Sequence, residues 1–364
     1  MIWGQLGWIV FLAGLPLAPL CGFGLLDPWN AQTAWAVSCV IVLLGVALAH
    51  PMKPLPINRP LGWLLVYLGL CWWVRWQTVM VLKQSTSILL LLSLLHVLAG
   101  LCFYWVAVMQ WDDTLLHRIL KAVACVGAVS VAYGYLQWAG LDELFRNYER
   151  SDIRRHVVGT VANDSHFGSY LALMIPVFLL QERFRWKLIA AAAFVLLWPC
   201  QSAVALVAAV LGAGFVLVAR DRRWLWAAIP FALIGAIWLW MEPHALNPHG
   251  RFQTWGQFLD LANRHLIRGM GQGWVAAFST TITDMDHPLA RWKHLHNEYL
   301  QILIELGVIG LVLVGWGILD AMRRWWRLTK TPLVITLGAI GVVFFALSSL
   351  NFVMHLWQLS SFGL

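Results

Sequence analysis

The sequence predicts an all-α polytopic membrane protein, on three observations. Hydrophobic residues make up 60% of the 364 residues and charged residues only 12%, which excludes an ordinary soluble domain with a polar surface. Unbroken apolar runs of about 20 residues, the length that crosses a bilayer, recur along the whole chain. These runs do not alternate apolar and polar residues as barrel strands would. We therefore expect a single transmembrane domain over residues 1–364, a bundle of about 11 or 12 helices.

Eleven apolar segments are the candidate spans, with boundaries uncertain by a few residues. They are residues 4–26, 31–49, 61–82, 87–109, 116–139, 166–181, 186–199, 202–219, 224–241, 297–320 and 332–350. The first is interpreted as a retained helix rather than a signal peptide, because no Lys or Arg precedes it and no small-residue cleavage site follows. The apolar tail, residues 351–364, either lies at the interface or forms part of a twelfth helix.

The basic residues beside the spans fall almost entirely on one side. They are Lys53, Arg59, Arg118, Lys121, Arg183, Arg185, Lys187, Arg220, Arg222, Arg223, Arg323, Arg324, Arg327 and Lys330. The positive-inside rule makes this side cytoplasmic, together with the N-terminus. Two long connecting segments, residues 140–165 and 242–296, then lie on the outer face. We expect function there, because loops held by a rigid scaffold commonly carry sites.

The longer outer loop contains two recognisable segments. Residues 250–261 place apolar side chains at positions 252, 255, 258 and 259, a spacing that predicts a short amphipathic helix at the membrane surface. A glycine-rich stretch follows at residues 268–274. No βαβ pattern surrounds it, so a dinucleotide site is not expected and a tight turn is the better interpretation. Its successive N–H groups could still hold an anion.

Acidic and imidazole side chains gather where this loop ends. Asp284, Asp286, His287, His294 and His296 are residue types that ligate divalent metals, but their spacing is not specific. A solvated polar loop without a metal is the favoured interpretation. The six cysteines are scattered and form no CxxC pair, so neither a disulfide nor a zinc site is expected.

The helix after the loop begins with a polar stripe. Asn297, Gln301 and Glu305 recur every four residues, with Glu298 beside them, a pattern that also fits a hydrogen-bonded seam between helices. Glu305 lies well inside the membrane, where a carboxylate needs a partner. Arg75 is the one basic residue deep in a predicted span, at a similar depth. We therefore predict a structural intramembrane pair of Arg75 and Glu305.

Three blocks of the second half of the chain resemble the O-antigen ligase and polymerase superfamily of bacterial membrane glycosyltransferases. They are residues 159–171, then 250–252 through 269–273, then 296–301 with Glu305, Gly307 and Gly310. Each block alone is weak, but their order and their placement on the outer face also match. The resemblance implies a GT-C-like helical bundle with a large periplasmic loop, in the bacterial inner membrane.

The activity that this resemblance implies is transfer of a glycan from undecaprenyl diphosphate to an acceptor hydroxyl on the periplasmic face, with inversion. No cofactor, metal, nucleotide sugar or nucleic acid is expected. Arg251 would bind the diphosphate through its guanidinium fork. His296 would orient or deprotonate the acceptor hydroxyl, or support the phosphate as a cation. The further substrate-binding candidates are Asn163, His166, Arg268, Arg291, His294, Asn297, Tyr299 and Gln301.

The chain departs from the family at one turn. An arginine usually follows a serine at the short outer turn that here reads Cys200-Gln201-Ser202-Ala203. Its phosphate-binding role would fall to another outer arginine, for which the candidates are Arg268, Arg291, Arg146, Arg150, Arg154 and Arg155. The last four alternate with acidic residues and most simply form a solvated face.

Simpler interpretations stand beside these assignments. His296 could be a helix-start residue that only hydrogen-bonds the loop, and Asn163 and His166 could cap the following helix. The acceptor could be lipid A core, another lipid-linked repeat, or a serine or threonine of a protein. We favour the ligase, since the chain has no large extra domain for a protein acceptor. A transporter of lipid-linked glycans would need charges through the whole membrane, whereas here they gather on the outer side.

Overall fold

The structure is a computed structural model that describes residues 59, 62–71, 113–142, 157–161, 163–224, 226, 250–281, 289 and 294–349. Regular secondary structure within these residues is entirely helical, which confirms the predicted all-α class for this part of the chain. Three of its helices are long and apolar enough to cross a membrane, Leu116–Trp138, Ala203–Arg220 and Glu298–Arg327. Shorter apolar helices cover Gly62–Cys71, Asp164–Leu180 and Pro332–Ser348. The predicted total of 11 or 12 spans stays a prediction.

Seven described helices correspond to predicted spans. One is Gly62–Cys71, within the predicted span 61–82. The others are α6 (Asp113–Trp138), α7 (Asp164–Leu180), α8 (Phe184–Leu196), α9 (Ala203–Arg220), α13 (Glu298–Arg327) and α14 (Pro332–Ser348). Their bounds differ from the predicted ones by a few residues, except that α13 continues past residue 320 as a polar extension that ends in basic residues. Predicted spans 4–26, 31–49 and 87–109, and all but two residues of 224–241, lie outside the described residues.

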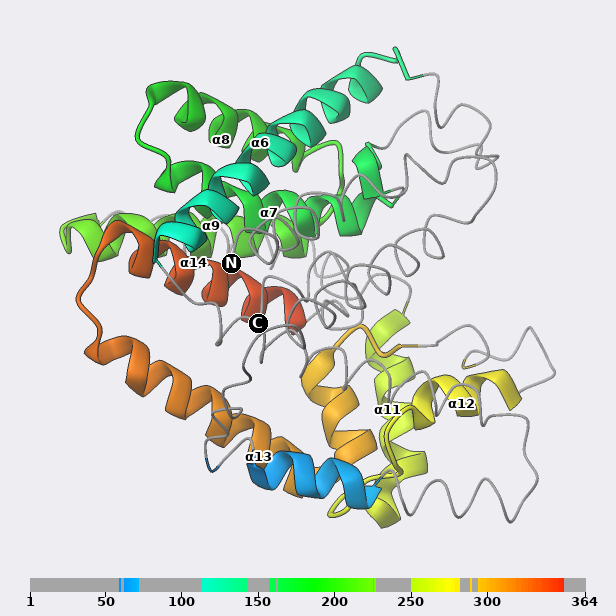
Figure 1. Cartoon of the computed structure of the whole chain (residues 1–364). Coiled ribbons are helices and arrows are strands. Elements are labelled where there is room, and N and C mark those ends of the chain that lie inside the picture. The colour runs from blue at the N-terminus through cyan, green and yellow to red at the C-terminus, as the bar shows by residue number, and fades with distance from the viewer. Residues whose placement is uncertain are drawn as a thin grey trace, which may run out of the picture.

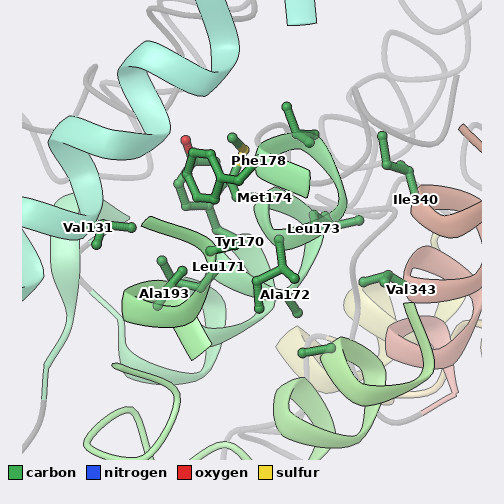
Figure 2. Packing of buried hydrophobic residues seen from close by; sticks show 14 of the residues in the cluster. Val131, Tyr170, Leu171, Ala172, Leu173, Met174, Phe178, Ala193, Ile340 and Val343 are labelled. Atoms are coloured by element: carbon green, nitrogen blue, oxygen red, sulfur yellow. The ribbon is translucent and has the colours of Figure 1, made fainter. Parts of the chain in front are cut away.

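Helix α7 is the centre of the bundle. Nearly every residue from His166 to Leu180 is buried, as expected for a helix that is apolar on all sides. It packs against α6, α8, α9 and α14, which surround it in Figure 1. Figure 2 shows the resulting apolar core, in which Tyr170, Met174 and Phe178 of α7 lie between Val131 of α6 and Ile340 of α14.

Small residues let these helices approach closely. A Cβ atom on Gly212 of α9 would collide with the side chain of Val343 on α14. On α7, a Cβ on Gly168 would lie 3.2 Å from the Cβ atoms of Ala205 and Ser202. Close packing at small residues is the usual way in which membrane helices associate, because lipid offers no hydrophobic drive between them.

The two ends of the bundle differ in chemistry. At one end, Arg220 of α9 reaches the carbonyl of Leu179 on α7, and Phe215 contacts Trp325 of α13 with ring centroids 5.4 Å apart. The Lys330 ammonium lies 3.6 Å from the centroid of the same Trp325 ring. Basic helix ends therefore meet on one side, as the sequence predicts. The starts of α7, α9 and α13 lie at the other end, where Tyr299 donates to the Phe345 carbonyl at 3.1 Å.

Helix α13 is broken at Gly307, whose φ of 69° lies outside the helical region. The bonds lost at the break are replaced by the loop segment 266–271. Met270 and Gly271 donate to the carbonyls of residues 304 and 305 at 2.8 and 2.9 Å, and Val308 donates to Leu266 at 2.8 Å. An interrupted helix is tolerated at membrane depth only where protein satisfies the freed backbone groups, as it does here. Figure 1 shows the first part of α13 beside α11 (Arg251–Ala262) and α12 (Trp274–Thr281).

Candidate functional site

Arg251 is the first residue of α11 (Arg251–Ala262) and is buried, with 9% of its surface exposed. Gly250 before it adopts a left-handed backbone (φ 71°), which turns the chain into the helix. Burial lowers the pKa of the Arg251 guanidinium below its usual value, since desolvation disfavours the charged form. His166, also buried, lies within electrostatic reach of this guanidinium. The charge of Arg251 on α11 therefore acts on the start of α7.

The predicted short helix is present as α11, and its buried face carries polar as well as apolar residues. Phe258 is buried, but Phe252 is 48% exposed. The residues that share the buried stripe with Phe258 in the first turn are Arg251 and Thr254. Positions 251, 254, 258 and 262 follow helical spacing, so α11 turns a polar first turn and an apolar remainder toward the protein. Arg251 therefore lies on the side of α11 that faces the protein.

The turn before α13 is fastened to α11. The Trp255 indole nitrogen donates to the carbonyl of Leu295 at 2.6 Å, and Leu295 is fully buried. His294 and His296 flank this residue, and the Nδ1 atom of each is shielded from solvent. His296 adopts a left-handed backbone, with φ of 54°. Since Trp255 lies about one turn after Arg251 on the helix, the histidine turn sits on the helix that carries the arginine.

Asn163 and Asn297 both act as helix N-caps. The side-chain oxygen of Asn163 accepts from the His166 amide at 3.0 Å, and that of Asn297 accepts from the Leu300 amide at 2.9 Å. Each bond satisfies an N–H group that would otherwise have no partner within its helix. The capping alternative for Asn163 therefore describes what this oxygen does.

The polar stripe of α13 contacts the loop. Glu305 Oε2 accepts from the Gly273 amide at 2.8 Å, and Glu305 Oε1 accepts from the Val275 amide at 3.2 Å. Gln301 donates to Glu305 Oε1 at 3.3 Å and accepts from the Leu295 amide at 3.2 Å. The stripe thus holds the glycine-rich turn and the histidine turn in one network.

The glycine-rich turn is present, and its amides hold an anion that belongs to the protein. Gly269, Gly271 and Gly273 all have positive φ. The Gly273 amide binds the Glu305 carboxylate, and a Cβ atom on Gly269 would collide with the Glu305 carbonyl. The amides of Gly271 and Gly273 are therefore hydrogen-bonded to Glu305 of α13 rather than to a bound phosphate.

The other site candidates are placed as follows. Tyr299 binds the Phe345 carbonyl, and Arg268 is exposed with a guanidinium nitrogen 3.4 Å from His265 Nδ1. Arg291, and Arg75 of the predicted pair with Glu305, lie outside the described residues. So do Asp284, Asp286 and His287, while the part of the chain that is described holds no group of three or more metal-ligating side chains.

Two contacts were not anticipated from the sequence. Trp255 was assigned to an apolar stripe, yet its indole N–H fixes the histidine turn. The Tyr67 hydroxyl lies 2.8 Å from the carbonyls of both Arg268 and Leu306, at the break of α13. A tyrosine in the middle of an apolar segment is the signal that could have indicated such a contact, because its hydroxyl needs a partner there.

Comparison of the chain with protein-family models, curated proteins and solved structures finds no match. The chemistry of the site is therefore judged on its geometry. The start of α11 carries the buried Arg251 guanidinium, and Trp255 of the same helix holds the turn that contains His294 and His296. Such a set suits the binding of an anionic substrate and the transfer of a proton.

Proposed function

We propose that this protein is a membrane glycosyltransferase that moves a glycan from undecaprenyl diphosphate to an acceptor hydroxyl, most simply as an O-antigen ligase with lipid A core as acceptor. The observation that carries the proposal is the buried Arg251 at the start of α11, a helix whose Trp255 holds the turn that contains His296. The second and third sequence blocks that resemble this family also contact each other, since the Gly273 amide donates to Glu305.

The reaction needs a cation for the donor and a base for the acceptor. The Arg251 fork would bind diphosphate oxygens, and its burial strengthens this contact by excluding water. His296 would take the proton of the acceptor hydroxyl as its oxygen attacks the anomeric carbon. The new glycosidic bond forms as the bond from the anomeric carbon to the phosphate oxygen breaks, and undecaprenyl diphosphate leaves. This single displacement inverts the anomeric configuration.

We propose that Arg251 takes the phosphate-binding role of the family arginine that is absent from the Cys200–Ser202 turn. The Cys200–Ser202 turn abuts the start of α7, since a Cβ on Gly168 would lie 3.2 Å from Ser202 Cβ and 3.5 Å from Cys200 Cβ. His166, near this end of α7, lies within electrostatic reach of the Arg251 guanidinium of α11. Arg251 is therefore proposed to take the role of the missing arginine. Arg268, the other described candidate for this role, is exposed.

Localisation follows from the two ends of the bundle. The basic end would face the cytoplasm, where the N-terminus would also lie, and the histidine end would face the periplasm. This arrangement fits a multi-pass protein of the bacterial inner membrane whose donor and acceptor both reach the site from the outer leaflet. Three apolar helices of spanning length support the membrane location.

The test is glycan transfer by the purified protein from an undecaprenyl-diphosphate glycan to lipid A core. We expect Arg251→Ala and His296→Ala each to lower the rate by about 100-fold or more, as loss of a phosphate clamp or a general base does. The matched controls are Arg264→Ala and His117→Ala, which change exposed side chains of the same types. Undiminished transfer by both site variants contradicts the mechanism, as does loss of activity with chelator.

The same assay separates the alternative acceptors. Elongation of lipid-linked glycan without added lipid A core indicates a polymerase, and glycosylation of serine or threonine in an added protein indicates a protein O-oligosaccharyltransferase. Movement of the lipid-linked glycan across a proteoliposome membrane without any transfer indicates a transporter and overturns the proposal.

A further inference from the structure

The peptide of Leu295 is held on both sides. Its N–H donates to Gln301 Oε1 at 3.2 Å, and its carbonyl accepts from the Trp255 indole at 2.6 Å. Gln301 is buried and Trp255 is partly buried, and the two lie on different helices, α13 and α11. The residue that follows, His296, has a left-handed backbone. A non-glycine residue keeps such a conformation only where its surroundings enforce it.

The side-chain amide of Gln301 can make both of its hydrogen bonds in one orientation only. A carboxylate accepts and cannot donate, so the NH₂ group must face Glu305 Oε1, 3.3 Å away. The amide oxygen is then directed at the Leu295 N–H. Glu305 is itself fixed by the amides of Gly273 and Val275. A chain of hydrogen bonds therefore runs from the glycine-rich turn through Glu305 and Gln301 to the peptide beside His296.

We propose that Gln301 and Trp255 are positioning residues that set the place of the His296 imidazole relative to Arg251. Trp255 ties the histidine turn to the helix that begins with Arg251, and Gln301 fixes the angle of the same peptide from α13. Gln301 thereby changes from a substrate-binding candidate to a support of the base. This inference rests on the proposed function, because it assigns the support of its catalytic histidine.

The kinetic test compares Gln301→Met and Trp255→Phe with the wild type. Methionine keeps the length of the side chain and loses both hydrogen bonds, and phenylalanine keeps an aromatic ring and loses the donor. We expect kcat to fall by about 10- to 100-fold, the usual effect of misplacing a catalytic group by about 1 Å. KM for the donor should stay within about twofold, because Arg251 is untouched. The matched controls, Gln257→Met and Trp316→Phe at exposed positions, should leave both constants unchanged.

A second measurement tests, without using activity, whether Gln301 and Trp255 hold the histidine turn. Histidine acylation by diethyl pyrocarbonate, located by mass spectrometry, should be slow at His296 in the wild type and several-fold faster in both variants, while exposed His117 reacts equally in all. Unchanged acylation in both variants, unchanged kcat in an active enzyme, or a higher donor KM at unchanged kcat each overturns the positioning role. If the wild type transfers no glycan, the proposed function is overturned. The expected acylation pattern in that case would still show that Gln301 and Trp255 hold the histidine turn.

Discussion

The central bundle and the outer region of this protein are held together by different interactions. In the bundle, α6, α7, α8, α9 and α14 share one large apolar core. The outer region, made of α11, α12 and the first part of α13, has a small core around Phe258, Trp274 and Ile304. Its segments are joined instead by main-chain hydrogen bonds and by the Glu305 carboxylate. Stability in the bundle comes from packing, whereas in the outer region it depends on a few polar atoms and glycines.

This difference in the kind of interaction gives a reason for placing the proposed site in the outer region. Packed apolar side chains adapt to small changes, because neighbouring rotamers can shift. Main-chain hydrogen bonds between α13 and the loop fix the backbone of the outer region, and the proposed site needs such a fixed placement of its base against the phosphate. The rigidity has a cost, since each polar group of the network must stay satisfied.

The largest effect is expected at the break of α13. Gly307→Ala puts a Cβ atom against the Ile267 carbonyl and forces alanine into a left-handed conformation. Both the clash and the backbone strain act on main-chain atoms that cannot move aside, so we expect a loss of about 3–5 kcal/mol of folding free energy. Thermal unfolding in detergent, followed by size-exclusion chromatography, measures it.

The control for this change is Gly315→Ala on the same helix, where a Cβ atom meets nothing within 4 Å. It should leave the unfolding temperature unchanged or raise it slightly, because alanine favours a helix. Equal unfolding temperatures for the two variants would show that the break is not rigid. That result would contradict the proposed difference between the outer region and the bundle.

A smaller effect is expected in the bundle, where side chains can give way. Gly212→Ala on α9 brings its Cβ against Val343 of α14, with a loss of about 1–3 kcal/mol. The double variant Gly212→Ala with Val343→Ala should recover much of this loss, because the colliding methyl group is removed. A double-mutant cycle of unfolding temperatures measures the coupling. If the two changes add independently, α9 and α14 do not meet at this pair.

Sequence reasoning located the helices of the bundle well because they are long and apolar, and such segments have few alternatives in lipid. It did not locate the break of α13, although Gly307 was noted within a family-like block. A single glycine in a helix predicts no break, since the break depends on the distant segment 266–271 that replaces the lost bonds. Contacts of this kind join residues far apart in the chain and leave no local pattern.

The sequence suggested the residues of the site, and the structure shows where some of them lie. Arg251 and His296 were identified from the resemblance, and the structure places them on segments joined by Trp255. A short amphipathic helix was predicted over residues 250–261, but apolar spacing alone does not show that Arg251 and Thr254 of its first turn are buried. Gln301 and Glu305 were identified as a polar stripe, but their partners are loop amides whose positions depend on the folded chain.

The smallest effect decides between two roles for Asn163. As the N-cap of α7 it accepts from the His166 amide, so Asn163→Ala should cost about 1 kcal/mol, whereas Asn163→Ser, which keeps a capping oxygen, should cost a few tenths. Because the cap fixes the turn that carries His166, transfer by the serine variant should stay close to that of the wild type. Unfolding temperatures and transfer rates of the two variants test this together. A serine variant that is as stable as the wild type yet transfers glycan more than about tenfold more slowly would show that the amide contacts substrate, since a cap acts through stability alone.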